Sequence, residues 1–306
     1  MLKPHRYLIV IAGPTASGKT AAAIRIAQAY TCAILSADAR QFYKEMPIGT
    51  AAPDSVELQQ APHHFVGQLS IHDQYDAGTF EQENIQLLEQ LYLQHTYAVL
   101  CGGSGLFIKA VTDGLDVLPD VPLDIREQVR VLYSEHGLTR LQTELASRDP
   151  EHYARVDKHN PQRLMRALEI CLATGKTYSE FRAGNPVARS FIPIKICLDI
   201  PRNELYDKIE QRVDAMMQAG WVEEAKALYP HRHLPALQTV GYKELFDFFD
   251  GKYSLEAATA LIKQRTRNYA KRQLTWFRNT GGYHMVHPRM LDTQLIDHLA
   301  QKMDHT

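Results

Sequence analysis

Short apolar runs alternate with segments of helical periodicity over most of this chain. The apolar runs, partly β-branched, predict buried strands at 6–12, 32–38, 97–101 and 193–200, with shorter ones at 62–67 and 283–286. Apolar residues at helical spacing predict helices at 21–29, 77–95, 202–219, 221–229 and 254–277, and the Gly- and Pro-bearing stretch 46–62 is predicted to be loop. Strands that alternate with helices are typical of a parallel sheet covered by helices, so the predicted fold class is α/β.

The alternation is interrupted between about residues 113 and 190. Helical periodicity recurs there at 123–136, 138–147 and 161–174, with Pro119, Pro122, Pro150 and Pro161 as breakers, and the pattern offers no strand. We therefore expect a sheet core in two parts, residues 1–112 and 191–306, with a helical insertion at 113–190.

The composition is that of an ordinary globular protein. Of 306 residues, 45% are hydrophobic and 23% are charged, and the net charge of −1 gives no hint of a nucleic-acid partner. The four cysteines lie far apart without a C-x-x-C pair, which argues against a metal or disulfide framework and favours a reduced, cytoplasmic protein. No apolar run approaches about 18 residues, and the first strand begins too early for a cleavable signal, so no membrane contact is expected.

The clearest motif follows the first predicted strand. It matches the phosphate-binding pattern G-x-x-x-x-G-K-[ST] and consists of Gly13, Pro14, Thr15, Ala16, Ser17, Gly18, Lys19 and Thr20. Its glycines let the backbone turn around an anion, while amide groups at the start of the next helix face that anion. Lys19 can give a point charge to the terminal phosphate, and the Thr20 hydroxyl can hold Mg²⁺. The motif therefore predicts a diphosphate or triphosphate site without saying which chemistry follows.

Asp38 ends the second predicted strand, at the edge where binding and catalytic groups gather in an open α/β sheet. There it can bind Mg²⁺, act as a general base or cap a turn. The strand at 97–101 leads into Gly-Gly, whereas a P-loop NTPase carries a metal-binding Asp on such a strand, which argues against ATP hydrolysis. Residues 40–43 (Arg-Gln-Phe-Tyr) offer groups that can hydrogen-bond to a base and stack on it.

Positive charge is concentrated at 257–291, a stretch without Asp or Glu. Its lysines and arginines are Lys263, Arg265, Arg267, Lys271, Arg272, Arg278 and Arg289, with Tyr269, Trp276 and Phe277 interleaved. This segment is either a polyanion contact with stacking aromatics or a solvated helix face whose aromatics lie in the core. Arg163 and Arg166 likewise fit either RNA contact or surface salt bridges. For His63-His64 we expect a structural or hydrogen-bonding role.

Together, motifs along residues 6–286 resemble the bacterial tRNA dimethylallyltransferases, or isopentenyl-diphosphate:tRNA transferases. The matching stretches are GPTASGKT at 13, SADARQFY at 36, PIGTAAP at 47, PHH at 62, GGSGLFIKA at 102, NPQRLMRALEI at 160, IEQRVDAMMQAGWVEE at 209, QTVGYKE at 238 and RNYAKRQLTWFR at 267. Their joint order is far more specific than any single motif. The resemblance implies a P-loop NTPase-like parallel sheet core with an inserted helical subdomain that grips tRNA.

By this resemblance the protein would transfer a dimethylallyl group from dimethylallyl diphosphate to N6 of adenosine 37, beside the anticodon, in tRNAs that read codons beginning with U. The implied catalytic residues are Asp38 as general base, Thr15 beside the reacting groups and Arg212 on the diphosphate. The phosphate loop, Gly13 to Thr20, would hold the diphosphate, with Mg²⁺ at Thr20. The implied tRNA contacts are Asp38, Ala39, Arg40, Gln41, Gly103, Ser104, Gln162, Arg163, Leu164, Met165, Arg166, Lys271, Arg272 and Gln273. A monomer is expected.

The chain departs from the family pattern at three positions. Ala39 follows Asp38 where the family has serine, Ser104 follows Gly-Gly where it has threonine, and Ala52 precedes proline where lysine is common. We expect weaker contacts at these positions rather than lost activity.

Three other functions fit parts of the pattern. An adenylate (free nucleotide) dimethylallyltransferase would need neither the insertion nor the basic stretch. A P-loop small-molecule kinase is disfavoured by the missing acid after 97–101. A non-catalytic RNA-binding protein is disfavoured because Lys19, Thr20 and Asp38 are all present.

Overall fold

The computed structural model describes residues 5–182 and 187–304, and the chain divides into two compact units. The core unit comprises Met1–Asp113 and Ala188–Thr306, and the second unit comprises Gly114–Val187. The core unit is built on a six-stranded sheet in the order β3-β2-β4-β1-β5-β6, and every pair of neighbouring strands is parallel. The strands are β1 Tyr7–Ala12, β2 Ile34–Ser36, β3 His63–His64, β4 Tyr97–Gly102, β5 Ile192–Leu198 and β6 His284–Val286.

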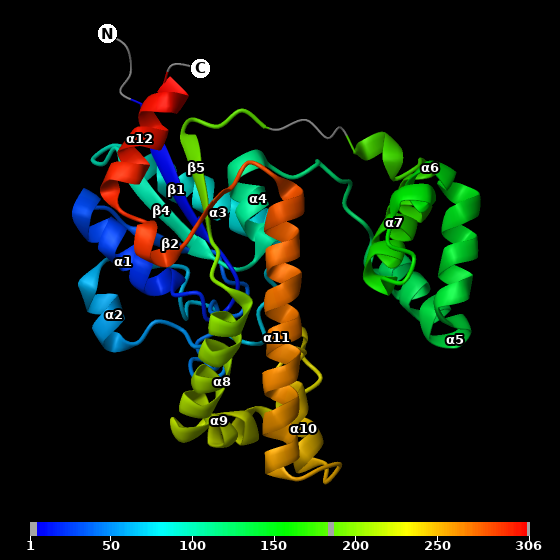
Figure 1. Ribbon diagram of the computed structural model, residues 1–306. Coiled ribbons are helices and arrows are strands. Elements are labelled where there is room, and N and C mark those ends of the chain that lie inside the picture. Colours follow the sequence, from blue (N-terminus) through cyan, green and yellow to red (C-terminus); the bar gives the residue numbers. More distant parts are fainter. Residues whose placement is uncertain (1–4, 183–186, 305–306) are drawn as a thin grey trace. The chain divides into compact units, whose positions relative to one another are not determined.

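The helices of the core unit connect these strands or follow them. They are α1 Lys19–Tyr30, α2 Ser55–Gln60, α3 Ala77–Leu91, α4 Gly105–Asp113, α8 Arg202–Gln218, α9 Trp221–Leu228, α10 Tyr242–Phe249, α11 Leu255–Thr280 and α12 Thr293–Asp304. The long helix α11 packs along both α8 and α10 (Figure 1). Within the described ranges, no helix is long and apolar enough to cross a bilayer.

Strand β1 lies in the interior of the sheet, and all of its residues are buried. Its alternate side chains point to opposite faces, so Ile9 and Ile11 enter one apolar core while Leu8 and Val10 enter another. Helices α1 and α12 cover the first face, and α3 and α4 cover the second (Figure 1). This doubly covered parallel sheet confirms the predicted α/β class.

Most predicted strands and helices are found within a few residues of their expected places, but four helices of the core unit, and the helix at Pro150–Arg155 in the second unit, are not predicted. Helix α2 lies in the stretch expected to be loop, because Asp54 and Glu57 form a capping box that starts a helix there. The short helix α10 and the helices α4 and α12 also had no prediction. Strand β2 is shorter than its apolar run, so Asp38 lies two residues beyond the strand, in the turn that follows.

The second unit is helical, as its sequence predicts. It contains α5 Leu123–Arg148, α6 Pro150–Arg155, α7 Pro161–Thr174 and a 3₁₀ turn at Ser179–Phe181. Helix α5 is kinked at Gly137, whose φ of 70° is left-handed, and the break falls between the two predicted segments. Val129, Leu141, Leu145 and Leu164 form the centre of its own apolar core. The binding of tRNA by this unit stays a prediction.

Asp149 joins three parts of the second unit. Its buried carboxylate accepts hydrogen bonds from the backbone amides of His152 at 2.9 Å and Ser179 at 2.8 Å, and from the Ser179 hydroxyl at 2.8 Å. Burial works to raise the pKa of Asp149, but the hydrogen bonds from His152 and Ser179 outweigh it and hold the pKa below its usual value.

The Asp149→Asn variant should therefore loosen the second unit by about 2 kcal/mol at pH 7, since it replaces charge-assisted hydrogen bonds. A depressed carboxyl pKa stabilises the fold above the unfolded value of about 3.9, and this contribution disappears as the pH falls through the folded value. Hydrogen exchange of amides 150–180 in the full chain should show faster opening in the variant at pH 7 and a smaller difference near pH 3. Asp157→Asn, at a carboxylate that accepts a hydrogen bond from only the His159 amide in the described structure, is the matched control. Equal protection in the two variants would contradict this role.

Candidate active site at the carboxyl edge of the sheet

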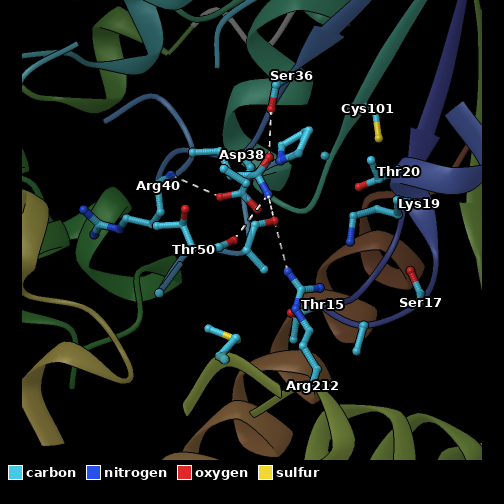
Figure 2. A pocket seen from close by; sticks show the side chains of 18 of the residues that line it. Thr15, Ser17, Lys19, Thr20, Ser36, Asp38, Arg40, Thr50, Cys101 and Arg212 are labelled. Atoms are coloured by element: carbon cyan, nitrogen blue, oxygen red, sulfur yellow. Dashed lines mark hydrogen bonds between the residues drawn. The ribbon is translucent and has the colours of Figure 1, made fainter. Parts of the chain in front are cut away.

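The carboxyl ends of β2 and β4 and the phosphate loop that follows β1 line a cavity of about 670 Å³. This volume is typical of small-ligand sites. The lining comes from the phosphate loop, the turn after β2, residues 49–54, and helices α8 and α11 (Figure 2). Motifs that lie far apart in the sequence therefore meet at the sheet edge where α/β proteins place their ligands.

The phosphate loop presents donors to this cavity. Gly18, with φ of 83°, precedes α1; no described side chain caps this helix, and its first turn carries no acid. The free amide groups and the helix dipole therefore favour an anion at this end. The buried hydroxyl oxygen of Ser17 has no hydrogen-bond partner in the described residues, so it too is available to a ligand.

Two cations, Lys19 and Arg212, reach the same space from α1 and α8 (Figure 2). Lys19 Nζ donates to the Pro14 carbonyl at 2.6 Å, and Arg212 Nη2 donates to the Ala51 carbonyl at 3.4 Å. Burial lowers the pKa of both groups, and the negative charge of Asp38 opposes that effect. Neither cation forms an ion pair with any carboxylate of residues 5–182 or 187–304. A bound anion would supply the counter-charge that both lack.

Asp38 lines the cavity in the turn after β2. Its Oδ1 accepts the backbone amide of Arg40 at 3.1 Å, so the turn-capping interpretation holds for one carboxylate oxygen. Within the described chain no donor bonds to Oδ2, which leaves that oxygen able to accept a proton. The capping bond fixes the carboxylate's orientation, so capping and general-base catalysis are compatible here.

The neighbours of Asp38 are engaged inside the protein. The Arg40 guanidinium donates to the Pro235 carbonyl at 3.2 Å and to the Ala236 carbonyl at 3.1 Å. The Gln41 amide donates to the Ala51 carbonyl at 2.9 Å. The Ser104 hydroxyl accepts the amide of Ala39 at 3.0 Å, so this hydroxyl keeps two adjoining loops together. Contact of this cluster with tRNA stays a prediction, but its side chains first serve to shape the cavity.

The predicted stacking of Phe42 on a base is wrong. Its ring is 1% exposed and packs against Tyr75, Phe80 and Phe107 in the core beneath the sheet edge. Tyr43 is also buried, 8% exposed, in the core around α9 and α10. Both residues lie in a turn-rich segment, and a motif match alone could not show that packing buries their rings.

The Gly102-Gly103 pair explains the missing acid at the end of β4. A Cβ atom on Gly102 would lie 2.1 Å from the Ala37 carbonyl oxygen, so no side chain fits there. A Cβ atom on Gly103 would lie 2.3 Å from the Gln273 amide nitrogen. The metal-binding Asp of a P-loop NTPase therefore has no place at this strand end.

Gln273 has a different role from the predicted tRNA contact. Its side chain is buried, 6% exposed, and both ends of its amide are used within the protein. Gln273 Oε1 accepts the backbone amide of Thr15 at 2.9 Å, and Nε2 donates to the Gly103 carbonyl at 2.9 Å. The residue thus ties α11 to the phosphate loop and to the turn after β4.

If the protein has the activity that the sequence resemblance implies, the Gln273→Met variant should lower kcat/KM for dimethylallyl diphosphate about tenfold or more, because it leaves two buried backbone groups unpaired beside the phosphate loop. The dissociation constant for tRNA should change less than about threefold. Steady-state kinetics and a tRNA-binding titration measure the two effects, with Gln264→Met, at an exposed position of the same helix, as control. The reverse pattern, weaker tRNA binding with unchanged diphosphate kinetics, would restore the direct tRNA contact.

The basic stretch at 257–291 is partly neutralised by acids from α8, from α10 and from the end of β5. The ion pairs are Lys263–Asp214, Arg265–Glu244, Arg267–Glu210 and Arg278–Asp199. Phe277 lies in the core, and Trp276 packs against Gly105, so these rings are not available for stacking. Lys271 and Arg272 are exposed and make no ion pair in the described residues. Arg289 is likewise exposed and makes no ion pair in the described residues. The polyanion interpretation is therefore limited to the neighbouring Lys271 and Arg272 and to Arg289.

The remaining tRNA candidates, residues 162–166, lie at the start of α7 in the second unit. Gln162 and Arg163 are exposed, and Arg166 pairs with Glu169 at 3.4 Å. Leu164 is fully buried in the unit's core, so its side chain cannot contact RNA, and Met165 packs against the same core. The contact of Gln162, Arg163 and Arg166 with tRNA stays a prediction, and Leu164 serves to hold the helix in place.

Several lining residues were not singled out as site residues by the sequence. They are Thr50, Met216, Trp221, Thr239, Val240, Thr266 and Tyr269. Thr50 and Thr239 belong to motifs that matched the family, and this match was the sequence signal that could have identified them as site residues. Tyr269 was noted only as a possible stacking ring; burial and the charge of Asp38 raise its pKa to about 12, so its phenol stays protonated. The His63 ring hydrogen-bonds to the Ala61 carbonyl at 2.8 Å, the kind of role predicted for it.

Comparison with known proteins gives one consistent answer. The family model "IPP transferase" matches residues 41–280. A tRNA dimethylallyltransferase of Christiangramia forsetii is 52% identical over 272 residues, covering 89% of this chain and 90% of the relative. The tRNA dimethylallyltransferase of Flavobacterium psychrophilum is 44% identical, covering 98% of this chain and 99% of the relative.

Solved structures agree with the fold. The full-length tRNA isopentenylpyrophosphate transferase of Bacillus halodurans matches with a TM-score of 0.71 and 30% identity, covering 99% of this chain and 100% of that one. A eukaryotic dimethylallyltransferase acting on tRNA has a TM-score of 0.79 at 24% identity, covering 98% and 77%, and supports the fold alone. The resemblance seen in the sequence is confirmed, and the chain belongs to the IPP transferase family.

Proposed function

We propose that this protein transfers the dimethylallyl group of dimethylallyl diphosphate to N6 of adenosine 37, beside the anticodon, in tRNAs that read codons beginning with U. The observation that carries the proposal is what meets at one cavity: two cations without an ion-pair partner among the described residues, the start of α1 without a described side-chain cap, and the Asp38 carboxylate. The choice of tRNA as acceptor is supported by the relatives, which are named tRNA dimethylallyltransferases.

The site can perform this substitution in one displacement. The N6 lone pair attacks C1 of the allyl group while the bond from C1 to the diphosphate oxygen breaks. Asp38 Oδ2 takes the proton that N6 loses. Lys19, Arg212 and the amides at the start of α1 stabilise the charge that develops on the leaving diphosphate. Thr15, on the phosphate loop, orients the reacting groups, and the target base leaves its stack at a cost of a few kcal/mol.

Mg²⁺ is the cofactor that we propose for this step. The Thr20 hydroxyl lines the cavity at the first turn of α1. In the described ranges no group of three His, Cys, Asp or Glu side chains forms a metal cage. A single protein hydroxyl fits Mg²⁺, because this ion takes most of its ligands from phosphate oxygens and water. Bound there, it would neutralise charge on the diphosphate.

For tRNA we propose contacts from exposed cations of both units. Lys271 and Arg272 on α11, and Arg163 on α7 beside Gln162, carry side chains that are exposed to solvent. Phosphate contacts from such groups supply most of the affinity for a nucleic acid. We further propose that the protein works as a monomer in the cytoplasm; its four cysteines are free, which suits a reducing compartment.

The test is prenyl transfer from labelled dimethylallyl diphosphate, with Mg²⁺, to an unmodified anticodon stem-loop. A matched stem-loop with guanosine at position 37, together with AMP and ATP, serves as the set of alternative acceptors. Label on the adenosine stem-loop alone is the expected result. Label on the mononucleotides would move the activity to the free-nucleotide transferases, and absence of label on every acceptor would refute the proposal.

A further inference from the structure

One wall of the cavity is an irregular segment, residues 47–53, which we call the wall loop. Residues Gly49 to Pro53 of this loop line the cavity. The loop has a tight fold of its own: the Ala51 amide donates to the Ile48 carbonyl at 2.9 Å, and the Ala52 amide donates to the Pro47 carbonyl at 3.0 Å. Ala51 has φ of 45°, a left-handed conformation that alanine adopts only when its surroundings enforce it.

Glu224 on α9 fixes the first part of this loop. Glu224 Oε2 accepts the Ile48 amide at 2.8 Å, and Oε1 accepts the Gly49 amide at 2.8 Å. The Tyr242 hydroxyl donates to Oε1 at 2.5 Å. Glu224 lies in the first turn of α9, where the helix dipole favours a carboxylate. The carboxylate therefore clamps two successive backbone amides of the wall loop.

The close packing around Gly49 leaves room for glycine alone at the point where Glu224 holds the loop. A Cβ atom there would lie 2.1 Å from Trp221 Nε1 and 2.3 Å from the Tyr242 hydroxyl. The loop backbone is thus pressed against α9 and α10 at the point where Glu224 holds it. No larger residue could occupy position 49 without moving the loop.

The wall loop in turn contacts Arg212 through the Ala51 carbonyl. The Ala51 carbonyl accepts Arg212 Nη2 at 3.4 Å and Gln41 Nε2 at 2.9 Å (Figure 2). The direction of this carbonyl depends on the left-handed φ of Ala51. The same carbonyl therefore orients the guanidinium that we assign to the leaving diphosphate.

We propose that Glu224 is a positioning residue: through the wall loop it sets the Ala51 carbonyl and so holds Arg212 ready for diphosphate. The inference rests on the proposed function, because it gives Arg212 a diphosphate to bind. Glu224 itself is not among the residues that line the cavity.

The test compares Glu224→Gln with Glu223→Gln. E224Q keeps the size of the side chain but turns one acceptor into a donor, so one backbone amide of the loop loses its partner. Glu223 is an exposed neighbour on the same turn and is the matched control. The expected result is a rise of about tenfold in KM for dimethylallyl diphosphate in E224Q, with KM for the tRNA stem-loop and the melting temperature close to wild type. E223Q should match wild type in all three measurements.

A second arm separates positioning from general support. In an Arg212→Ala background, E224Q should raise the diphosphate KM no further, because Glu224 acts through that arginine. Additive effects, an unchanged KM in E224Q, or a joint loss of melting temperature and both KM values would overturn the inference. An Arg212→Ala variant with wild-type kinetics would refute the assignment of Arg212 and the inference with it. Should E224Q fail to fold, Glu224→Asp, which keeps the charge but shortens the reach, is measured in the same way.

Discussion

The Lys19→Met variant should lose prenyl transfer by about 10²- to 10³-fold in kcat, the range found when one preorganised donor to a developing negative charge is removed. Lys19 faces the cavity beside the uncapped start of α1 and has no carboxylate partner in the described chain. Methionine has a similar length but no charge, so it removes the electrostatic term while filling the space. Single-turnover transfer from labelled dimethylallyl diphosphate measures the loss.

The same substitution should leave the fold intact or make it more stable. Burial lowers the pKa of Lys19, which means that the folded protein holds this charge at a cost in free energy. Replacing it with an apolar side chain removes that cost, so the melting temperature without ligand should stay equal or rise. The stabilisation of wild type by added diphosphate should vanish in the variant. Lys226→Met, at an exposed lysine of α9, is the control. If Lys19→Met kept its prenyl-transfer activity, Lys19 would have no part in the mechanism.

The sequence predicted the parts of the site that are local in the chain. The phosphate loop needs only its glycines, Lys19 and the flanking strand and helix, and the structure forms it as expected. Asp38 was found because a short apolar run ends just before it. The break in α5 at Gly137 falls between the predicted segments 123–136 and 138–147, because the local periodicity stops at that position.

The parts that escaped prediction depend on contacts between distant segments. Gln273 carries an unremarkable amide in a basic helix, and only the folded chain shows it bonded to Thr15, 258 positions away. The acids that pair with Arg265, Arg267 and Arg278 lie 21, 57 and 79 positions earlier, so charge counted along the segment overstated its free positive charge. Local composition cannot reveal such partners, because burial and pairing are set by packing.

The Asp38→Asn variant should lose transfer by about 10²- to 10⁴-fold, the contribution of a well-placed general base. Asparagine has the same shape, and its oxygen can still accept the Arg40 amide, so the turn after β2 should keep its conformation. Binding of both substrates should therefore survive. Isothermal titration with the stem-loop and with dimethylallyl diphosphate would show dissociation constants within about threefold of wild type.

Loss of transfer with retained binding in Asp38→Asn would separate the catalytic role of this residue from a role in substrate binding. Asp76→Asn is the matched control, because Asp76 caps α3 through the amides of Gly78 and Thr79, and asparagine caps a helix about as well as aspartate. Its kinetics should equal those of wild type. If Asp38→Asn lost tRNA binding and transfer to the same extent, Asp38 would be a tRNA contact rather than the base. If it lost neither, the proton of N6 would have to leave by another route, and the only remaining role of Asp38 supported by its contacts would be to cap the turn that carries Arg40 and Gln41.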